Sequence, residues 1–197
     1  MAKRLFDIIF SLIGIILSSP FLLLFSILIK IESPGPAFYK GERMGKDGKI
    51  FKMFKFRSMV MNADKIGGPS TSADDERLLK IGKFLRRYQL DELPQFINIL
   101  KADMSFVGPR PEVPSEIERY SREDKKIILS VRPGLTDLAT LENVHEEEIL
   151  KGEKDPHEAY RRLIQPKKIK LAKKYVQNRS FWLDIKIILR TVKSAII

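Results

Sequence analysis

The sequence predicts a mostly helical α+β protein with an N-terminal membrane helix, a small β-hairpin and amphipathic helices. Residues 8–29 contain no charged side chain. Two aromatic-rich segments flank Lys46-Asp47-Gly48, which is a hairpin-turn signal. Later segments repeat apolar residues at helical spacing. We therefore divide the chain into a membrane helix at residues 1–31 and a cytoplasmic domain at residues 32–197 that ends in an amphipathic helix.

The apolar N-terminal segment is long enough to cross a bilayer, because a straight helix needs about 20 apolar residues to do so. Pro20 lies in the middle of the segment. Proline removes one backbone donor and clashes with the carbonyl four residues earlier, while a neighbouring Ser19 hydroxyl can re-bond the freed carbonyl. We predict a kink at Ser19-Pro20.

The charges that flank this helix bear on its topology, since cytoplasmic flanks are enriched in Lys and Arg. Both flanks are basic here: Lys3, Arg4, Lys30, Lys40, Arg43 and Lys46. We therefore favour a re-entrant helix with both ends in the cytoplasm, and a kinked single span is the alternative. A cleaved signal peptide fits least, because its apolar part is only about 7 to 15 residues long and a small-residue cleavage site is required.

The composition limits the partners and the chemistry. The chain has 36 Lys plus Arg against 25 Asp plus Glu, a net charge of +11. This excess favours anionic ligands, and the membrane helix points to lipid phosphate rather than nucleic acid. Cysteine is absent, which excludes disulfides and thiolate metal sites, and His145 and His157 are too few for a typical histidine site. Homo-oligomer formation stays open.

The predicted hairpin pairs Ala37–Met44 with Lys49–Met59. Its basic residues, Lys52, Lys55 and Arg57, alternate with Phe51, Phe54 and Phe56. Two interpretations stay open, a half-buried strand with a solvated basic face or a surface that faces phosphate. The Gly- and Pro-containing segment Met61–Glu76 is predicted to be a mobile loop that could act as a lid.

A helix is predicted from Arg77 to just before Leu90, and a second begins at Asp91–Gln95. Their predicted buried faces are Leu78, Ile81, Leu85 and Tyr88 for the first, and Leu93, Phe96, Ile97 and Leu100 for the second. The following stiff loop, Val107–Pro111, presents Arg110 between two prolines.

The C-terminal half is predicted to be mainly helical. The expected elements are a helix at Ser115–Leu129, a turn at Arg132–Thr136, a capped helix start at Asp155–Glu158, helices broken near Pro166 and ending around Asn178, and a last helix at Phe181–Ile197. The last helix carries Trp182 and Leu189 on one apolar stripe, which suits either a membrane-interface helix or an ordinary docking helix.

Asp91-Glu92 is a carboxylate pair in basic surroundings. It can simply cap a helix. Alternatively it can be chemical, and because adjacent helical residues point about 100° apart, one carboxylate would then act as nucleophile and the other as metal ligand or orienting group. Arg86, Arg87, Arg110 and Arg132 supply more cation than a cap requires. A Walker phosphate-binding motif is absent from the sequence.

Four motifs resemble the bacterial sugar transferases called monotopic phosphoglycosyl transferases, of the small type with a single catalytic domain. They are Lys55-Phe56-Arg57-Ser58-Met59, Leu90-Asp91-Glu92-Leu93-Pro94-Gln95, Asp103-Met104-Ser105-Phe106-Val107-Gly108-Pro109-Arg110-Pro111 and Arg132-Pro133-Gly134-Leu135-Thr136. The N-terminal segment is similar to that family's re-entrant helix, and the fold implied adds amphipathic interfacial helices and a small β-hairpin in a compact cytoplasmic domain. The large extra membrane domain of some polymer-priming members has no counterpart in this sequence.

The resemblance implies transfer of a phosphosugar from a UDP-sugar to polyprenol phosphate at the cytoplasmic face of the bacterial inner membrane, with release of UMP. It implies a ping-pong cycle in which Asp91 is the nucleophile, Glu92 assists, and Mg²⁺ bridges this dyad and the substrate phosphate. Matching positions imply that the substrate-binding residues Arg86, Arg110 and Arg132 lie beside the dyad, near the nucleotide or sugar, and near phosphate, respectively. Lys55 and Arg57 are also implied to bind substrate, on a weaker match.

The sequence departs from the family after Thr136. Many members have Gly-Trp-Ala-Gln-Val there, whereas this chain has Asp137-Leu138-Ala139-Thr140-Leu141. That segment can shape the sugar pocket, so the resemblance does not identify the donor sugar. A competing class is a membrane-tethered protein that binds anionic lipid or nucleic acid without turnover.

Overall fold

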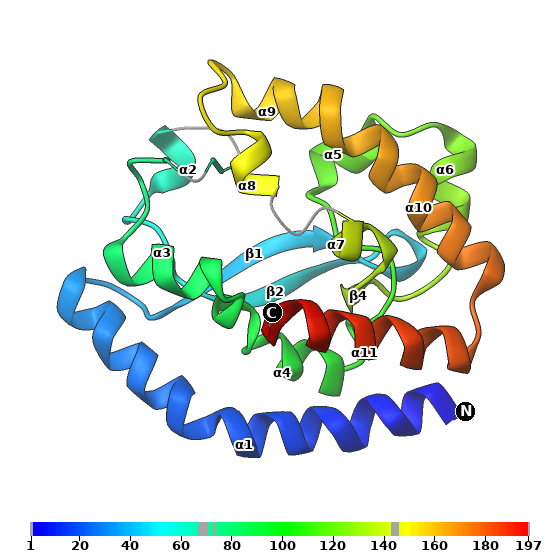
Figure 1. Ribbon diagram of the computed structural model, residues 1–197, viewed down its shortest axis with the longest axis horizontal. Coiled ribbons are helices and arrows are strands. Elements are labelled where there is room, and N and C mark those ends of the chain that lie inside the picture. The colour runs from blue at the N-terminus through cyan, green and yellow to red at the C-terminus, as the bar shows by residue number, and fades with distance from the viewer. Residues whose placement is uncertain (1, 67–70, 73, 143–145, 197) are drawn as a thin grey trace.

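The computed structural model describes residues 2–66, 71–72, 74–142 and 146–196. The long helix α1 (Ala2–Glu32) lies along one side of the molecule, and a central β-hairpin is surrounded by shorter helices (Figure 1). The prediction of a mostly helical protein with one long apolar N-terminal helix and a small hairpin is confirmed.

Helix α1 continues through Pro20 instead of breaking there, and Figure 1 shows a bend along its length. Proline leaves the carbonyl of Ile16 without its usual amide donor. The Ser19 hydroxyl donates to that carbonyl over 2.8 Å. This hydrogen bond explains how the helix tolerates the proline, as the sequence predicts.

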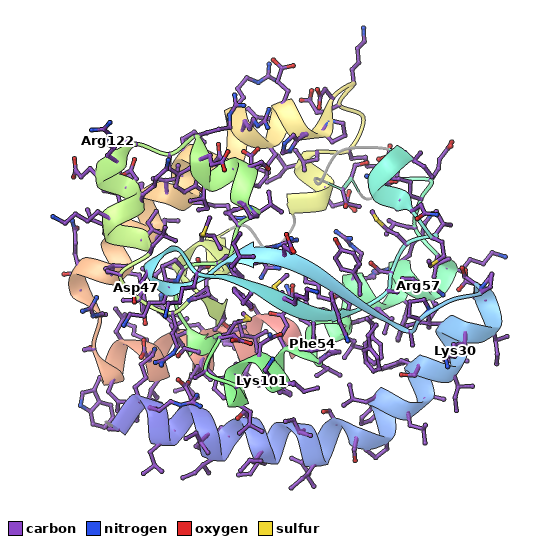
Figure 2. All side chains as sticks on the ribbon, turned by 180° about the vertical axis from the view of Figure 1, so that it is seen from behind. Lys30, Asp47, Phe54, Arg57, Lys101 and Arg122 are labelled. Carbon is purple, nitrogen blue, oxygen red and sulfur yellow. The ribbon has the colours of Figure 1, made fainter. Side chains whose placement is uncertain are left out.

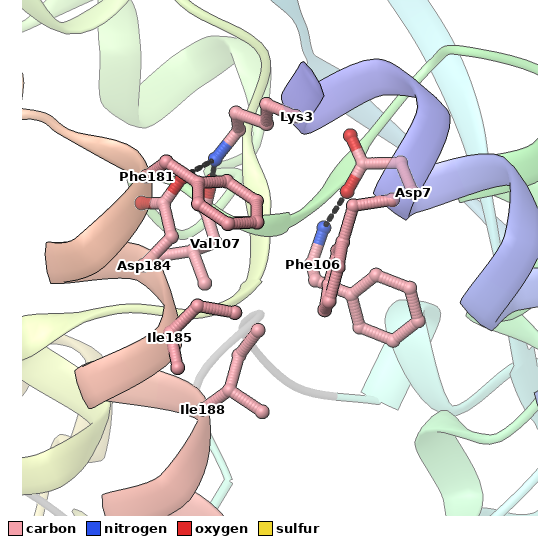
Figure 3. A pocket seen from close by; sticks show the side chains of 9 residues that line it. Lys3, Asp7, Phe106, Val107, Phe181, Asp184, Ile185 and Ile188 are labelled. Carbon is pink, nitrogen blue, oxygen red and sulfur yellow. Dashed lines mark hydrogen bonds and ion pairs between the residues drawn. The ribbon is translucent and has the colours of Figure 1, made fainter.

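The N-terminal end of α1 is attached to the globular domain by its two cations. Lys3 Nζ donates to the carbonyl of Val107 over 2.8 Å and pairs with Asp184 of the last helix (Figure 3). Arg4 donates to the carbonyls of Ile99 and Leu100. These side chains are therefore anchors as well as flanking charges.

The C-terminal end of α1 is attached to the same domain. The Glu32 carboxylate accepts from the backbone amides of Lys80 and Ile81, which begin α3 (Lys80–Arg87). Because a helix start has unpaired amides, this carboxylate acts as a cap supplied by another helix. Both ends of α1 thus contact one domain.

Most of the outer side of α1 is apolar and uncovered. It is the one helix in the described chain that is long and apolar enough to cross a membrane, and only 17% of its most hydrophobic window is buried. Side chains project from α1 away from the domain along its length (Figure 2). The most exposed are Leu5, Ile16, Leu17, Leu23 and Ile31. Such a surface marks contact with a partner or a membrane.

The hairpin forms as predicted, with slightly shorter strands, β1 (Phe38–Met44) and β2 (Ile50–Phe56), paired antiparallel. Asp47 and Gly48 have positive φ in the short turn η1 (Lys46–Gly48) that connects them. Asn98 fixes the hairpin on α4 (Gln95–Leu100) by accepting from the amide of Phe54 and donating to the carbonyl of Lys52. Lys101 lies over the Phe54 ring (Figure 2).

The helix predicted from Arg77 is α3, and it ends before Leu90 as expected. Its predicted buried face is only partly right, because Leu78 and Leu85 are buried whereas Tyr88 is exposed. For α4 the predicted face is only partly buried, and the fully buried residues are Gln95, Asn98 and Ile99. The sequence alone did not show that Phe96 would lie against α1, where a side chain on Gly14 would meet its ring.

The lid segment is described only in part. It contains the short helix α2 (Ala63–Ile66), while Gly67-Gly68-Pro69-Ser70 lies outside the described residues. A lid function therefore stays a prediction. His145 also lies outside the described residues.

Three local predictions for the C-terminal half need correction. The single helix at Ser115–Leu129 is two helices, because Ser121 caps a new start. The turn at Arg132–Thr136 contains a strand that pairs in parallel with the Asp103–Pro111 segment. Pro166 lies in the first turn of a helix, where its missing donor is harmless, and the irregularity is a π-helical turn before it.

The elements of this part of the chain are α5 (Pro114–Glu118), α6 (Arg122–Ile128), β3 (Ser105–Val107), β4 (Gly134–Thr136), α7 (Leu138–Glu142), α8 (Glu146–Ile149), α9 (Pro156–Ala159), η3 (Tyr160–Ile164) and α10 (Gln165–Asn178).

The last helix, α11 (Phe181–Ile196), docks on the domain, and its predicted role at a membrane interface stays a prediction. Ile187 is buried in a core cluster with Val107 and Tyr175. Trp182 and Leu189, on the predicted apolar stripe, are exposed. The helix therefore docks on the domain along one side and presents apolar residues on another. Asp155 caps α9 as predicted, accepting from the amides of His157 and Glu158.

Candidate active site

The Asp91-Glu92 pair lies in a tight turn between α3 and α4. Gln89 adopts a left-handed conformation with φ 55°, and the 3₁₀ turn η2 (Leu90–Glu92) follows at once. Leu90 packs on a core cluster that includes Phe25 and Ile29 of α1. The apolar N-terminal helix thus contributes Phe25 and Ile29 to the core on which the residue before the carboxylate pair packs.

Both carboxylates are shielded and surrounded by cations. Asp91 is only 5% exposed. Lys55 Nζ donates to Glu92 Oε1 over 2.7 Å and lies 3.7 Å from Asp91 Oδ2. Arg110 pairs with Glu92 through both terminal nitrogens. Glu92 therefore holds two cations beside Asp91, whereas Asp91 has the weaker ion pair.

The two carboxylates have different proton affinities. Burial raises the pKa of Asp91, and the nearby Lys55 ammonium offsets this effect only in part. Burial acts in the same direction on Glu92, but the Arg110 guanidinium and the Lys55 ammonium outweigh it and hold the pKa of Glu92 well below its usual range. The pair thus consists of a Glu92 whose ionised form is strongly favoured and an Asp91 whose charge is balanced less completely.

The interpretation of Asp91 as a simple helix cap is wrong. Leu90–Glu92 forms its own turn, and α4 begins later with Pro94 at the cap position and no side-chain cap hydrogen bond. Within the described chain, Asp91 accepts no amide hydrogen bond from that helix start. A buried carboxylate that caps nothing has a different role, and perturbed pKa values of this type are typical of functional sites.

Two further arginines complete the electrostatic surroundings. The positive charge of Arg86 on α3 favours the ionised form of Asp91. Arg43 on β1 is close enough to interact with both Glu92 and Arg110. Sequence reasoning treated Arg43 only as a flanking charge of the membrane helix. The hairpin brings Arg43 near Glu92. The sequence did not reveal this proximity, because the two residues are 49 positions apart.

The loop that carries Arg110 is held by a close crossing of two backbones. The amide of Gly108 donates to the carbonyl of Thr136, and the amide of Gly134 donates to the carbonyl of Pro109. A side chain on Gly134 would lie 2.1 Å from the Gly108 amide nitrogen. The two motifs that contain these glycines therefore need glycine because their chains touch.

Side chains outside the predicted set hold the same loop. The buried Asp137 carboxylate accepts from the Arg110 amide over 3.2 Å. Tyr160 in the π-helical turn donates its hydroxyl proton to Glu112 over 2.5 Å. Asp137 is the first residue of the segment in which the sequence departs from the family pattern. This departure was a signal that could have identified Asp137 as a residue of the site. Nothing in the local sequence around Tyr160 identified its contact.

The structure brings Lys55, Arg86 and Arg110 to the dyad but gives Arg57 and Arg132 different contacts. Arg132 donates to the carbonyl of Ala102. Arg57 is buried and donates to the carbonyls of Ser33 and Pro34 after α1. A substrate role for these two arginines stays a prediction, and Arg57 has a clear structural position.

Replacing Arg57 by Lys should lower stability, because one ammonium cannot reproduce the two carbonyl contacts of a buried guanidinium. We expect a loss of about 2 kcal/mol in the free energy of unfolding, the scale of hydrogen bonds to a charged group. Urea unfolding would measure it, with exposed Arg122→Lys on α6 as the control. A weaker apparent donor affinity without a stability loss would instead favour a substrate role for Arg57.

The described residues contain no group of three or more His, Cys, Asp or Glu arranged to hold a metal ion. Mg²⁺ is commonly bound by one or two carboxylates together with substrate phosphates. Asp91 and the adjoining Glu92 supply two carboxylates of this kind, with the cations that a diphosphate also needs close by. The residues therefore fit an ion that arrives with a diphosphate.

A long apolar helix that supports a buried carboxylate pair among cations is an arrangement expected of a membrane-associated transferase for phosphorylated substrates. The family described as bacterial sugar transferase matches residues 1–197. The chain belongs to the bacterial sugar transferase family.

Three relatives share one type of activity in their names. A putative undecaprenyl-phosphate N-acetylgalactosaminyl 1-phosphate transferase of Bacillus subtilis is 50% identical over 121 residues, covering 61% of this chain and 68% of the relative. UDP-N-acetylgalactosamine-undecaprenyl-phosphate N-acetylgalactosaminephosphotransferase of Aeromonas hydrophila is 36% identical, covering 98% of this chain. UDP-glucose:undecaprenyl-phosphate glucose-1-phosphate transferase of Escherichia coli is 39% identical, also over 98%. The chain spans only 43% and 39% of the last two relatives.

Proposed function

We propose that this protein transfers a phosphosugar from a UDP-sugar to polyprenol phosphate, forming polyprenyl diphosphosugar and UMP. This would be the first membrane step in the synthesis of a glycoconjugate or polysaccharide. One observation carries the proposal: Asp91 is buried beside an ionised Glu92 that holds Lys55 and Arg110. The names of the relatives support the substrate classes.

In the proposed cycle, an Asp91 carboxylate oxygen attacks the phosphorus that bears the sugar. The bond from that phosphorus to the bridging oxygen breaks, UMP leaves with the bond's electron pair, and an acyl phosphate forms on Asp91. A phosphate oxygen of polyprenol phosphate then attacks the same phosphorus and releases the Asp91 carboxylate. Neither step consumes water or a redox partner.

The other residues would position charge for these steps. Glu92 stays ionised and keeps Lys55 and Arg110 beside the nucleophile, where they can stabilise the substrate phosphates. Arg86 adds a third positive charge that favours ionised Asp91. Bound Mg²⁺, held by Asp91 and Glu92 together with the diphosphate, would offset the repulsion between anions.

A test of this function mixes purified protein with a panel of UDP-sugars, polyprenol phosphate and Mg²⁺ and measures released UMP and lipid product. We expect UMP and a diphosphate-linked lipid from at least one donor, and loss of both with chelator. Binding of anionic lipid without UMP release from any donor would favour the competing class, a membrane-tethered binding protein.

We also propose a monotopic location on the cytoplasmic face of the inner membrane, with the lipid bilayer as a partner and α1 as a re-entrant helix. The support is that both ends of α1 contact the same domain, through Lys3 and Glu32 among others. A polyprenol phosphate keeps its chain in lipid and its phosphate at the interface. The nucleophile must therefore be held at that depth, and α1 supports Leu90 beside it.

The location predicts that both chain ends are cytoplasmic. The protein has no cysteine, so Ala2→Cys and Ile197→Cys provide single labelling sites, with Arg122→Cys as a domain control. An impermeant maleimide should label none of the three in intact cells and all three after lysis. Labelling of residue 2 alone from outside would make α1 a span.

Pro20→Leu should shift α1 towards a span if the kink is what turns the helix back to the cytoplasmic face. The same labelling of residue 2 would measure this shift.

A further inference from the structure

An exposed row of aromatic rings runs from α1 onto α3, which lie side by side (Figure 1). We call Phe21, Phe84 and Tyr88 the aromatic strip, and they are 54%, 46% and 53% exposed. The buried Phe25 ring links them, with its centroid 6.3 Å from Phe21 and 6.4 Å from Phe84. Phe84 and Tyr88 are 5.1 Å apart. The three exposed rings are therefore connected through ring contacts, with the buried Phe25 joining the part on α1 to the part on α3.

One end of this strip is cationic and close in sequence to the nucleophile. Tyr88 precedes Asp91 by three residues. The Arg87 guanidinium lies 5.9 Å from the centre of the Tyr88 ring. Arg86, on the same helix, favours the ionised form of Asp91. The aromatic strip thus runs from apolar helix α1 to the last turn of α3, which carries Arg86 and Arg87 and lies just before the dyad in the sequence.

The other end is continuous with the uncovered outer side of α1. Leu24 and Leu28, near Phe21 on that helix, are also exposed. A contiguous apolar surface of this kind normally has a ligand, a protein or a membrane against it. The combination of an apolar strip and a cationic end matches a ligand with a long apolar chain and an anionic head.

We propose that the aromatic strip binds the first isoprene units of the polyprenol phosphate acceptor and guides its phosphate to Arg86 and Asp91. This proposal rests on the proposed function and extends it by assigning the acceptor's chain to a surface. Charge complementarity selects the occupant, because the lipid's phosphate needs the cations and its branched chain needs the rings. A strip that merely anchors the protein in the bilayer would not distinguish one acceptor from another.

The test compares acceptors of different chain length in the full-length protein reconstituted in vesicles. The double variant Phe84→Ser/Tyr88→Ser removes two exposed rings, so the fold should persist. Trp182→Ser on α11 is the matched control, because this ring is 79% exposed but lies outside the strip. For each protein, kcat/KM is measured with a long polyprenol phosphate and with a short two-unit prenyl phosphate, together with the KM for the UDP-sugar and the fraction bound to vesicles.

We expect the preference for the long acceptor over the short one to fall about tenfold in the double variant, the scale of losing two aromatic contacts. The KM for the UDP-sugar and vesicle binding should match the wild type, and Trp182→Ser should keep the long-chain preference. An unchanged preference in the double variant, or an equal loss in Trp182→Ser, would overturn the proposal. Wild-type protein that releases no UMP would instead overturn the proposed function, so the two failures are distinguishable.

Discussion

Asp91→Asn should abolish phosphosugar transfer and at the same time make the folded protein more stable. The amide is nearly the same size but cannot form the acyl phosphate, so we expect turnover to fall roughly 10³-fold or more, as when other nucleophiles are removed. UMP release with the donor panel measures this loss. Glu92 and its contacts with Lys55 and Arg110 should remain.

The gain in stability follows from the direction of the pKa shift. Folding raises the pKa of Asp91 above its ordinary value of 3.8, chiefly through burial. As the pH rises, the unfolded chain therefore loses the proton first, and stability falls until the pH passes the higher folded value. At neutral pH the ionised Asp91 lowers stability, and a neutral Asn avoids this cost.

Thermal unfolding at neutral pH would measure the change, and the difference between variant and wild type should vanish below the ordinary pKa. Asp124→Asn is a suitable control, because its ion pair with Lys173 and hydrogen bond with Ser121 lower the pKa of Asp124. That control should not gain stability at neutral pH. A fully active Asp91→Asn protein, or one destabilised at neutral pH, would contradict the proposed role of this buried carboxylate.

The same shift predicts an unusual acid limit for activity. The nucleophile must be ionised, so kcat/KM for the UDP-sugar should begin to fall at a pH above 3.8, where an ordinary aspartate would still be charged. Glu92 should not contribute to this limb, because its pKa is lowered. The measurement is a pH profile with folding monitored by circular dichroism, and activity that persists unchanged down to pH 3.8 would contradict it.

The sequence predicted the parts of the site that depend on local patterns. The hairpin turn at Asp47-Gly48 and the end of α3 before Leu90 follow from residue preferences within a few positions. The motif resemblance supplied Asp91 and Arg110. The resemblance also implied Arg86 beside the dyad. It did not separate Lys55, which binds Glu92, from Arg57 two residues later, which binds the end of α1.

Long-range contacts were less predictable than local elements, because residue preferences act only within a few positions of the chain. A three-residue parallel pair such as β3 and β4 has too few residues to show a pattern, and its pairing depends on segments almost thirty residues apart. The Tyr160 contact with Glu112 joins segments 48 residues apart. Such contacts depend on how helices pack, and sequence periodicity contains no information about the partner.

Gly134→Ala should strongly reduce activity by displacing the Arg110 loop, although residue 134 has no side chain at the site. The new methyl group would lie 2.1 Å from the Gly108 amide nitrogen and 2.4 Å from the Gly108 carbonyl oxygen. Both are backbone atoms, so no side-chain rotation can relieve the overlap. The strands β3 and β4 must separate, and the hydrogen bonds between Gly108 and Thr136 and between Gly134 and Pro109 weaken.

We expect a stability loss of about 1 to 3 kcal/mol, the usual cost of overpacking. Turnover per folded molecule should fall roughly 10²-fold, since a shift of about 1 Å in a positioning group has effects of that size. Gly48→Asn is the control, because position 48 has open space and its left-handed backbone suits Asn. Urea unfolding and UMP release measured on the same preparations separate the two effects. If Gly134→Ala kept normal turnover, the Arg110 loop would not need this crossing, and the pairing of Arg110 with Glu92 would lose its role in positioning the substrate phosphates.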